Sequence, residues 1–273
     1  MGGGKGQENR IQKTFARLKA KGEKAFVIFI TAGDPDIKTT KEIMFELEKS
    51  GADIIELGIP FSDPMADGTT IQAASERALK NGTTLNDVLK LVRDVRQKTE
   101  IPIILFGYYN PIFAYGVKRF AYSAKKAGAD GVLVVDLPPE EADELKIETD
   151  KNSIDLIFLL TPTSDNARVK LVAEKASGFI YYVSVAGVTG ARKNLASNLK
   201  RNINAIKRNT ALPICVGFGI STREQVKKVS SIADGVVVGS AIVKLIAHSE
   251  GKKGFVKGVG SFVSNLKAAT KGF

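Results

Sequence analysis

Eight short apolar segments, each of strand length, recur along the chain and alternate with longer amphipathic segments. The short segments are rich in β-branched residues and apolar almost throughout, which is typical of parallel strands covered on both faces. The segments between them have helical spacing and are long enough to cross back over a sheet. The predicted strands span residues 25–31, 54–57, 103–106, 131–135, 156–160, 179–184, 214–216 and 235–238.

This alternation runs through the chain of 273 residues without an interruption that would mark a domain boundary. Eight βα units in one chain of this length favour a closed (β/α)8 barrel, here preceded by an extra N-terminal helix at about residues 9–21. The alternative is an open doubly wound sheet, which usually follows its first strand with a Gly-x-Gly-x-x-Gly turn. Because Thr-Ala-Gly-Asp-Pro stands there, at residues 31–35, we expect a single barrel domain over residues 1–273, with residues 1–8 flexible.

Histidine and cysteine are almost absent from the chain. His248 is the one histidine and Cys215 the one cysteine, so an intrachain disulfide, a Cys/His zinc site and a histidine-activated nucleophile are all disfavoured. Proton transfer then falls to carboxylates, Lys or Tyr, and we expect neither a metal nor a cofactor. Cysteine usage, together with the lack of a signal or membrane-length segment, predicts a cytoplasmic protein that is not bound to a membrane.

The formal net charge of +11 is concentrated near the C-terminus, where residues 200–273 carry 13 basic and 3 acidic side chains. Basic runs interleaved with aromatic residues and known nucleic-acid motifs are both missing, so we expect no nucleic-acid partner. Two interpretations stay open. The cations either lie on solvated helix faces or create a field that attracts a phosphorylated substrate.

Two acidic residues follow the second predicted strand in positions suited to catalysis. Glu56 has apolar neighbours in Ile-Ile-Glu-Leu-Gly, and burial without a cation raises a carboxyl pKa until the group can both give and take a proton near neutrality. A Glu tied to a backbone or Lys partner is the structural alternative. Asp67 ends a long loop stiffened by two prolines, from which its side chain can turn back over the barrel mouth. Asp63, directly before Pro64, is more typical of a turn former.

Glycine-rich turns follow the seventh and eighth predicted strands, and each leads into a helix. Glycines let backbone N–H groups approach an anion, and a helix N-terminus adds partial positive charge. Barrels commonly bind phosphate between these two loops, so Gly219, Gly239 and Ser240 are candidate phosphate ligands. The segment after the sixth strand, residues 184–192, is small and Gly-spaced, which fits either a connector or a hinged lid.

Residues 56–68, Glu-Leu-Gly-Ile-Pro-Phe-Ser-Asp-Pro-Met-Ala-Asp-Gly, closely resemble the signature of the tryptophan synthase alpha chain family. Residues 186–190, Ala-Gly-Val-Thr-Gly, resemble the mobile sixth loop of that family. The likeness covers nearly the whole chain, and the first motif is highly specific. Further matching segments are residues 29–35, 107–111, 136–138, 217–221 and 239–243.

The resemblance implies a lyase of tryptophan biosynthesis that cleaves indole-3-glycerol phosphate to indole and glyceraldehyde 3-phosphate. It implies that Glu56 is the general acid and base, that Asp67 stabilises the cationic indole ring, and that Thr189 belongs to the lid. It also implies a tryptophan synthase beta chain as partner, in an alpha2beta2 complex. The implied phosphate ligands are Gly190, Gly219, Gly239 and Ser240, and the implied indole pocket is Phe29, Ile71, Phe106, Leu133, Tyr181 and Phe218.

One departure from the family pattern is visible at Thr69, where the family usually has Pro, so we expect a less constrained loop.

Three other functions remain open at this point. The chain could be a free-standing lyase, a mainly allosteric partner of the beta chain, or an isomerase-type barrel that acts on another sugar phosphate. The paired acidic residues Glu56 and Asp67 favour the lyase over the last two.

Overall fold

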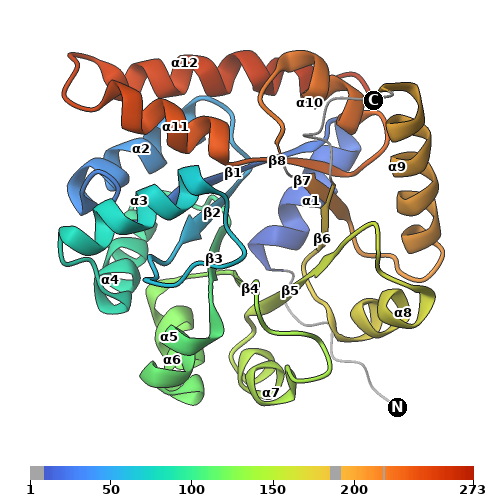
Figure 1. Cartoon of the computed structure of the whole chain (residues 1–273), viewed down its shortest axis with the longest axis horizontal. Helices are drawn as coiled ribbons and strands as arrows, with labels where there is room; N and C mark the ends of the chain where they lie inside the picture. The colour runs from blue at the N-terminus through green and yellow to red at the C-terminus, as the bar shows by residue number, and fades with distance from the viewer. Residues whose placement is uncertain (1–8, 185–191, 218) are drawn as a thin grey trace.

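Eight parallel strands close into a barrel in which every strand pairs with its neighbours in chain order and β8 pairs with β1. The computed structural model describes residues 9–184, 192–217 and 219–273 (Figure 1). The predicted (β/α)8 fold is confirmed. The strands are β1 (Ala25–Thr31), β2 (Ile54–Gly58), β3 (Ile103–Gly107), β4 (Gly131–Val134), β5 (Asp155–Leu160), β6 (Ile180–Val183), β7 (Ile214–Gly217) and β8 (Gly235–Val238).

Burial on both faces explains why the strands lack a polar side. Every residue of β1 is buried, although successive side chains point to opposite faces. Phe26, Ile28 and Ile30 pack in the cluster between the sheet and the outer helices. Ala25 and Val27 pack in a second cluster inside the barrel, which also holds the buried Cys215. The apolar runs therefore mark strands enclosed by protein on either side.

Helices form an outer ring around the barrel (Figure 1). One helix begins later than its sequence pattern predicts. Helical spacing starts at Pro139 and extends to Glu148, but the helix begins only at Asp143, because Pro138 and Pro139 lie in a turn in which the Glu141 N–H donates to the Pro138 carbonyl. The helices are α1 (Arg10–Ala20), α2 (Ile37–Lys49), α3 (Thr69–Lys80), α4 (Leu85–Arg96), α5 (Tyr109–Tyr115), α6 (Val117–Ala127), α7 (Asp143–Lys151), α8 (Asn166–Lys175), α9 (Arg192–Lys207), α10 (Arg223–Ser230), α11 (Ser240–Ser249) and α12 (Phe255–Lys267), followed by the 3-10 turn Ala268–Thr270.

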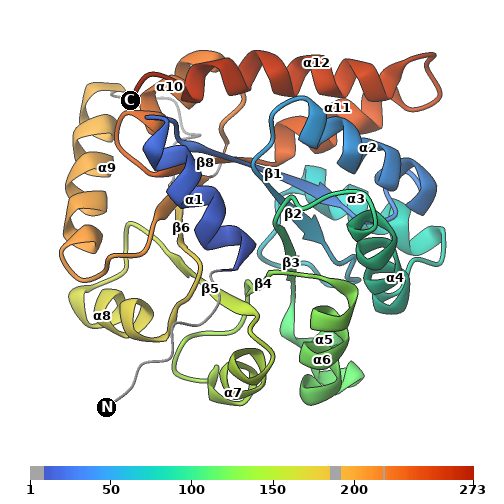
Figure 2. The same cartoon turned by 180° about the vertical axis from the view of Figure 1, so that it is seen from behind.

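The extra N-terminal helix α1 lies across the end of the barrel where the strands begin (Figure 2). Asn9 caps it in a reciprocal pair with Gln12. Ile11 and Leu18 are buried in the interior cluster, and the ring of Phe15 lies 5.9 Å from that of Phe179. This helix covers the base of the barrel, so the opposite end is the expected ligand side.

A recurring Asp before the strands ties neighbouring strands together at the base. Asp53, Asp130 and Asp234 precede β2, β4 and β8. Their carboxylates accept the backbone N–H groups of Phe26, Ile103 and Ile214 at 2.9 to 3.0 Å. Two of these aspartates also hold α1, because Arg17 contacts Asp53 and Arg10 contacts Asp130, each at 3.1 Å. The repeated Asp in the sequence is therefore a structural feature of the base.

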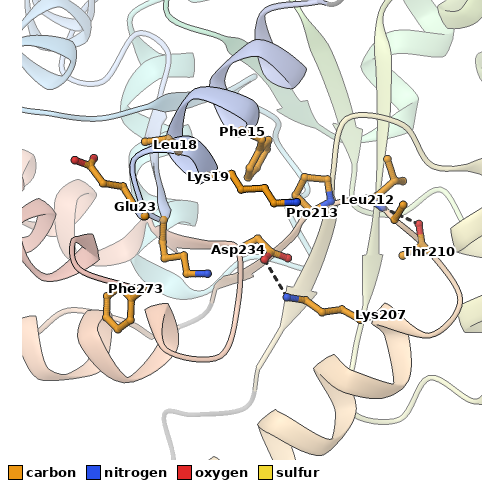
Figure 3. Close-up of a pocket in the computed structure, with 13 residues that line it drawn as sticks. Phe15, Leu18, Lys19, Glu23, Lys207, Thr210, Leu212, Pro213, Asp234 and Phe273 are labelled. Carbon is orange, nitrogen blue, oxygen red and sulfur yellow. Dashed lines mark hydrogen bonds and ion pairs between the residues drawn. The ribbon is translucent and has the colours of Figure 1, made fainter.

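A cavity of about 370 Å³ also lies at this base, between the end of α1 and the loops that precede β7 and β8 (Figure 3). Phe15 and Pro213 contribute apolar walls, and Lys207 is paired with Asp234 at 2.9 Å. The cavity is at the end of the barrel opposite to Glu56 and the loops that carry Asp67 and Gly239.

Across the described ranges, we find no helix long and apolar enough to cross a membrane.

Candidate active site

Glu56 lies inside the barrel near the carboxyl end of β2. Its register neighbours are Phe29 of β1 and Ile104 of β3, so it is flanked by apolar side chains. The residue is 1% exposed, and neither carboxylate oxygen has a hydrogen-bond partner within the described ranges. Burial alone raises the pKa of this carboxyl to about 8. Glu56 is therefore protonated at neutral pH, yet close enough to neutrality to lose its proton again.

Tyr181 and Cys215 lie within electrostatic range of Glu56 inside the barrel. They are register neighbours on β6 and β7. Burial raises the pKa of both the Tyr181 hydroxyl and the Cys215 thiol well above its usual range, and the charge of Glu56 adds to each shift. Both groups thus stay protonated, which leaves Glu56 as the titratable group of this interior that can exchange a proton near neutral pH.

Asp67 lies on the loop between β2 and α3 and is half-buried. Its Oδ2 accepts a hydrogen bond from the Tyr108 hydroxyl at 3.0 Å, and the same hydroxyl accepts the Ala66 N–H at 3.0 Å. Burial raises the pKa of the Asp67 carboxyl, while the bond from Tyr108 opposes that rise. The two candidate carboxyls therefore occupy different environments, since among the described residues Tyr108 donates to Asp67 and no side chain or backbone group donates to Glu56.

The loop that carries Asp67 is held by several polar contacts. The Asp67 N–H donates to the Pro64 carbonyl at 3.0 Å, and Gln72 Nε2 donates to the Asp67 carbonyl at 2.9 Å. Asp63 is exposed, and its side chain accepts a bond from the adjacent Ser62 hydroxyl at 2.5 Å. Asp63 thus fits the turn-forming role that its place before Pro64 indicates, and only Asp67 turns inward.

An apolar cluster lies beside these carboxyls. Phe29 packs with Ala74 and Val243, and the partly buried Ile71 and Phe106 pack against it. The rings of Phe29 and Phe106 meet edge to face, with centroids 5.0 Å apart. Three of the predicted pocket residues, Phe29, Ile71 and Phe106, are therefore together. Leu133 and Tyr181 lie in the interior cluster, which Phe106 also contacts, and Phe218 lies outside the described residues.

The glycine turns after β7 and β8 come from adjacent strands. Gly219 has φ +69°, in the left-handed region that favours glycine. A Cβ on Gly239 would stand 3.2 Å from the Phe29 Cβ, so this turn adjoins the apolar cluster. Helix α11 starts at Ser240 without a side-chain cap, whereas Thr222 and Gln225 cap α10. The start of α11 is therefore the better place for an anion. The other two predicted loop residues, Thr189 and Gly190, lie outside the described residues.

Metal ligation has little support at this site. In residues 9–184, 192–217 and 219–273, no group of three His, Cys, Asp or Glu side chains could hold a metal ion. His248 is exposed on α11, where its Nδ1 lies 2.8 Å from the Lys244 carbonyl oxygen. What the site offers chemically is one protonated buried carboxyl, one hydrogen-bonded carboxyl, an apolar cluster and an uncapped helix start.

A model of the tryptophan synthase alpha chain family matches residues 15–271. The chain belongs to this family. The function of the family is the cleavage of indole-3-glycerol phosphate, a lyase reaction of tryptophan biosynthesis, and its members form alpha2beta2 complexes with a beta chain. The resemblance seen in the sequence is thereby confirmed, and the isomerase alternative is no longer needed.

Relatives from this family match the chain over nearly its full length. The tryptophan synthase alpha chain of Geotalea uraniireducens (strain Rf4) is 59% identical and covers 96% of this chain and 98% of its own length. That of Geobacter sp. (strain M21) is 58% identical, with coverages of 95% and 97%. The crystal structure of tryptophan synthase subunit alpha from Legionella pneumophila str. Paris superposes with a TM-score of 0.90 at 44% identity, covering 97% of this chain and 99% of that chain.

The structure adds two side chains, Tyr108 and Thr31, to the candidate site. Tyr108 follows β3 directly, and this position at the end of a strand indicates that it lies at the barrel mouth. Its hydrogen bond to Asp67 joins residues 41 apart in the sequence and therefore depends on the fold. Thr31 ends β1, and its hydroxyl is buried with no partner in the described part of the chain. A buried hydroxyl without a partner at this end of the barrel is a candidate for a substrate contact.

Thr69 occupies the first position of α3, after Gly68. Proline is favoured at the first position of a helix because its φ suits the helix and its missing N–H is not needed there. Threonine adopts the same helical position here, and Gln72 and Tyr108 hold the loop by hydrogen bonds instead. The loss of constraint expected at Thr69 stays a prediction.

Proposed function

We propose that Glu56 and Asp67 carry out the family reaction in this chain, the retro-aldol cleavage of indole-3-glycerol phosphate to indole and glyceraldehyde 3-phosphate. The observation that carries this assignment is the Glu56 carboxyl, which is fully buried, has no partner in the described residues and has a pKa of about 8. A structural Glu would be tied to a donor or a cation. An untied, protonated carboxyl at the catalytic end of a barrel is suited to proton transfer.

Glu56 delivers its proton to C3 of the indole ring, which leaves the ring as a cation with its charge shared by the ring nitrogen. The carboxylate then takes the proton of the side-chain hydroxyl on the carbon attached to C3. The electrons of that O–H bond form the aldehyde C=O, the C–C bond to C3 breaks, and its electron pair restores the aromatic ring. One proton is given and one is taken, so Glu56 ends in its starting state.

Asp67 stabilises the ring cation and accepts the indole N–H. A negative charge placed where positive charge develops lowers the barrier, and it does so most in a site that excludes water. The Tyr108 hydroxyl fixes one oxygen of Asp67 and favours its ionised form. This difference between the two carboxyls supports a division of labour in which Glu56 is protonated while Asp67 is ionised.

The apolar cluster of Phe29, Ile71 and Phe106 binds the indole ring, with Leu133, Tyr181 and Phe218 completing the pocket. The substrate phosphate binds at the uncapped start of α11, at Gly239 and Ser240, together with Gly219 and Gly190. This arrangement is supported by the contact between Gly239 and Phe29, since it puts the anion site next to the ring site. Thr189 belongs to the lid.

The assignment is tested with Glu56→Gln, which keeps the shape of the side chain but cannot exchange a proton. We expect indole release from indole-3-glycerol phosphate to fall by a factor of about 10³ or more, while binding of glycerol 3-phosphate stays within about twofold. The matched control is Glu174→Gln, at an exposed position on α8, which should leave turnover unchanged. Normal turnover in Glu56→Gln would overturn the mechanism.

A tryptophan synthase beta chain is the partner that receives the indole. Helix α1 covers the base of the barrel and the proposed site is at the opposite end, so indole leaves by the mouth and the partner covers it. Two large apolar side chains near this end are exposed, Met65 at 91% and Phe113 at 61%, as expected for surface that another chain buries. We expect Phe113→Asp to weaken co-elution with the beta chain without changing the turnover of the alpha chain alone.

Adding the beta chain to the wild-type chain, and measuring both co-elution and indole release, decides between the remaining alternatives. Stimulation of indole release by the beta chain supports the two-subunit enzyme. Full activity without co-elution supports a free-standing lyase, and co-elution without any activity supports a mainly allosteric role. A cytoplasmic location remains a prediction from the single, reduced Cys215.

A further inference from the structure

We propose that Asp34 and Arg77 form a positioning pair that sets the place of Asp67 through helix α3. The pair joins the loop after β1 to the helix that begins two residues after Asp67. This inference rests on the proposed role of Asp67 in cleavage. It adds two residues that are members of neither the apolar cluster nor the glycine turns.

The pair is bidentate and one side of it is buried. Arg77 Nε donates to Asp34 Oδ1 at 2.8 Å, and Arg77 Nη2 donates to Asp34 Oδ2 at 2.9 Å. Asp34 is 3% exposed, and the hydrogen bonding of Arg77 to the Asp34 carboxylate is the first cause of the raised pKa of Arg77. Two parallel bonds fix both the distance and the angle between loop and helix, which a single contact cannot do.

Helix α3 is attached at both ends, so its position is transmitted to Asp67. Near its start, Gln72 Nε2 donates to the Asp67 carbonyl at 2.9 Å and to the Pro64 carbonyl at 3.4 Å. At its other end, Asn81 Nδ2 donates to the Pro35 carbonyl, next to Asp34. A shift of α3 relative to the loop after β1 therefore moves the backbone of Asp67 along with Gln72.

The loop after β1 is a fixed reference for the reacting groups. β1 also carries Phe29, the register neighbour of Glu56 and a wall of the apolar cluster. Ala74 of α3 packs in that cluster, but an apolar contact alone would let the helix slide relative to the strand. The two parallel hydrogen bonds of the Arg77 guanidinium do not permit such a shift. The pair therefore fixes Asp67 relative to the strand beside Glu56. A misplacement of about 1 Å in a catalytic group can cost a factor of about 10² in rate.

The test is a double-mutant cycle of Arg77→Gln and Asp67→Asn, with indole release measured in single turnover at enzyme excess. We expect Arg77→Gln to lower the rate about tenfold in the wild-type background, with substrate affinity within about twofold. In the Asp67→Asn background we expect the same substitution to change the rate less than twofold, since the group that it positions is gone. Arg77→Lys keeps the cation but loses the fork, and we expect an intermediate rate.

The control is Arg168→Gln, which breaks the exposed ion pair between Arg168 and Glu140 and should leave the rate unchanged. Equal losses from Arg77→Gln in both backgrounds would show a general structural effect and overturn the proposal, as would a wild-type rate in that variant. If the wild-type chain releases no indole at all, the proposed function fails and the positioning proposal is overturned with it. If Asp67→Asn is fully active, the role of Asp67 fails and the positioning proposal falls with it.

Discussion

The buried Glu56 carboxyl should make the stability of the folded chain depend on pH in a defined direction. The unfolded chain ionises this group above its ordinary pKa of 4.5, whereas the folded chain keeps it protonated up to about pH 8. Between these values the unfolded state binds fewer protons, so stability falls as pH rises. Below 4.5 both states are protonated and the effect vanishes. Above about pH 8 both are ionised and the loss stays constant.

The magnitude follows from the two pKa values. One pKa unit corresponds to about 1.4 kcal/mol, so the free energy of unfolding should lose at most about 5 kcal/mol by pH 8, and about 3 kcal/mol of this by pH 7. Glu56→Gln cannot ionise and should escape this loss. The variant should therefore have nearly the stability of the wild type at low pH and should be more stable by several kcal/mol at high pH.

The assay is urea-induced unfolding of both proteins, followed by circular dichroism at about pH 5, 7 and 9. Other titrating groups cancel in the difference between wild type and variant, because they are common to both. Glu174→Gln, at an exposed position on α8, serves as the matched control. If the curves of Glu56→Gln and wild type run parallel from pH 5 to 9, the reasoning about burial is refuted.

Two further predictions concern Asp67 and the phosphate site. Tyr108→Phe removes the hydroxyl that donates to Asp67, so the pKa of Asp67 should rise. The acidic limb of the pH–rate profile should then move to higher pH, and kcat should fall about tenfold. An unchanged profile counts against the division of labour between the carboxyls. Ser240→Asp puts a negative charge at the uncapped start of α11, where it would repel the substrate phosphate. The substitution should raise KM for indole-3-glycerol phosphate at least about tenfold with little change in kcat. An unchanged KM would mean that the phosphate binds elsewhere.

Local pattern was sufficient to predict the strands. β1 spans Ala25–Thr31 and β8 spans Gly235–Val238, as the apolar runs indicated, because strands buried on both faces need apolar residues throughout. The pattern was less reliable where proline intervenes, as at the start of α7. Helix α3 begins directly after the motif of residues 56–68, and the short α5 overlaps the matching segment 107–111, so functional motifs obscure the helical spacing there.

The sequence by itself determined the fold class, the family and the two candidate carboxyls, because these depend on residue type, local spacing and a specific motif around Glu56 and Asp67. Only the tertiary structure decided that both Glu56 oxygens lack a partner within the described residues, that Tyr108 binds Asp67 across 41 residues, and that Arg77 reaches Asp34 across 43. Each of these depends on barrel closure, which brings distant segments together and removes water from around one carboxyl. Desolvation and contact between distant residues are properties of the closed barrel, and local sequence does not encode them.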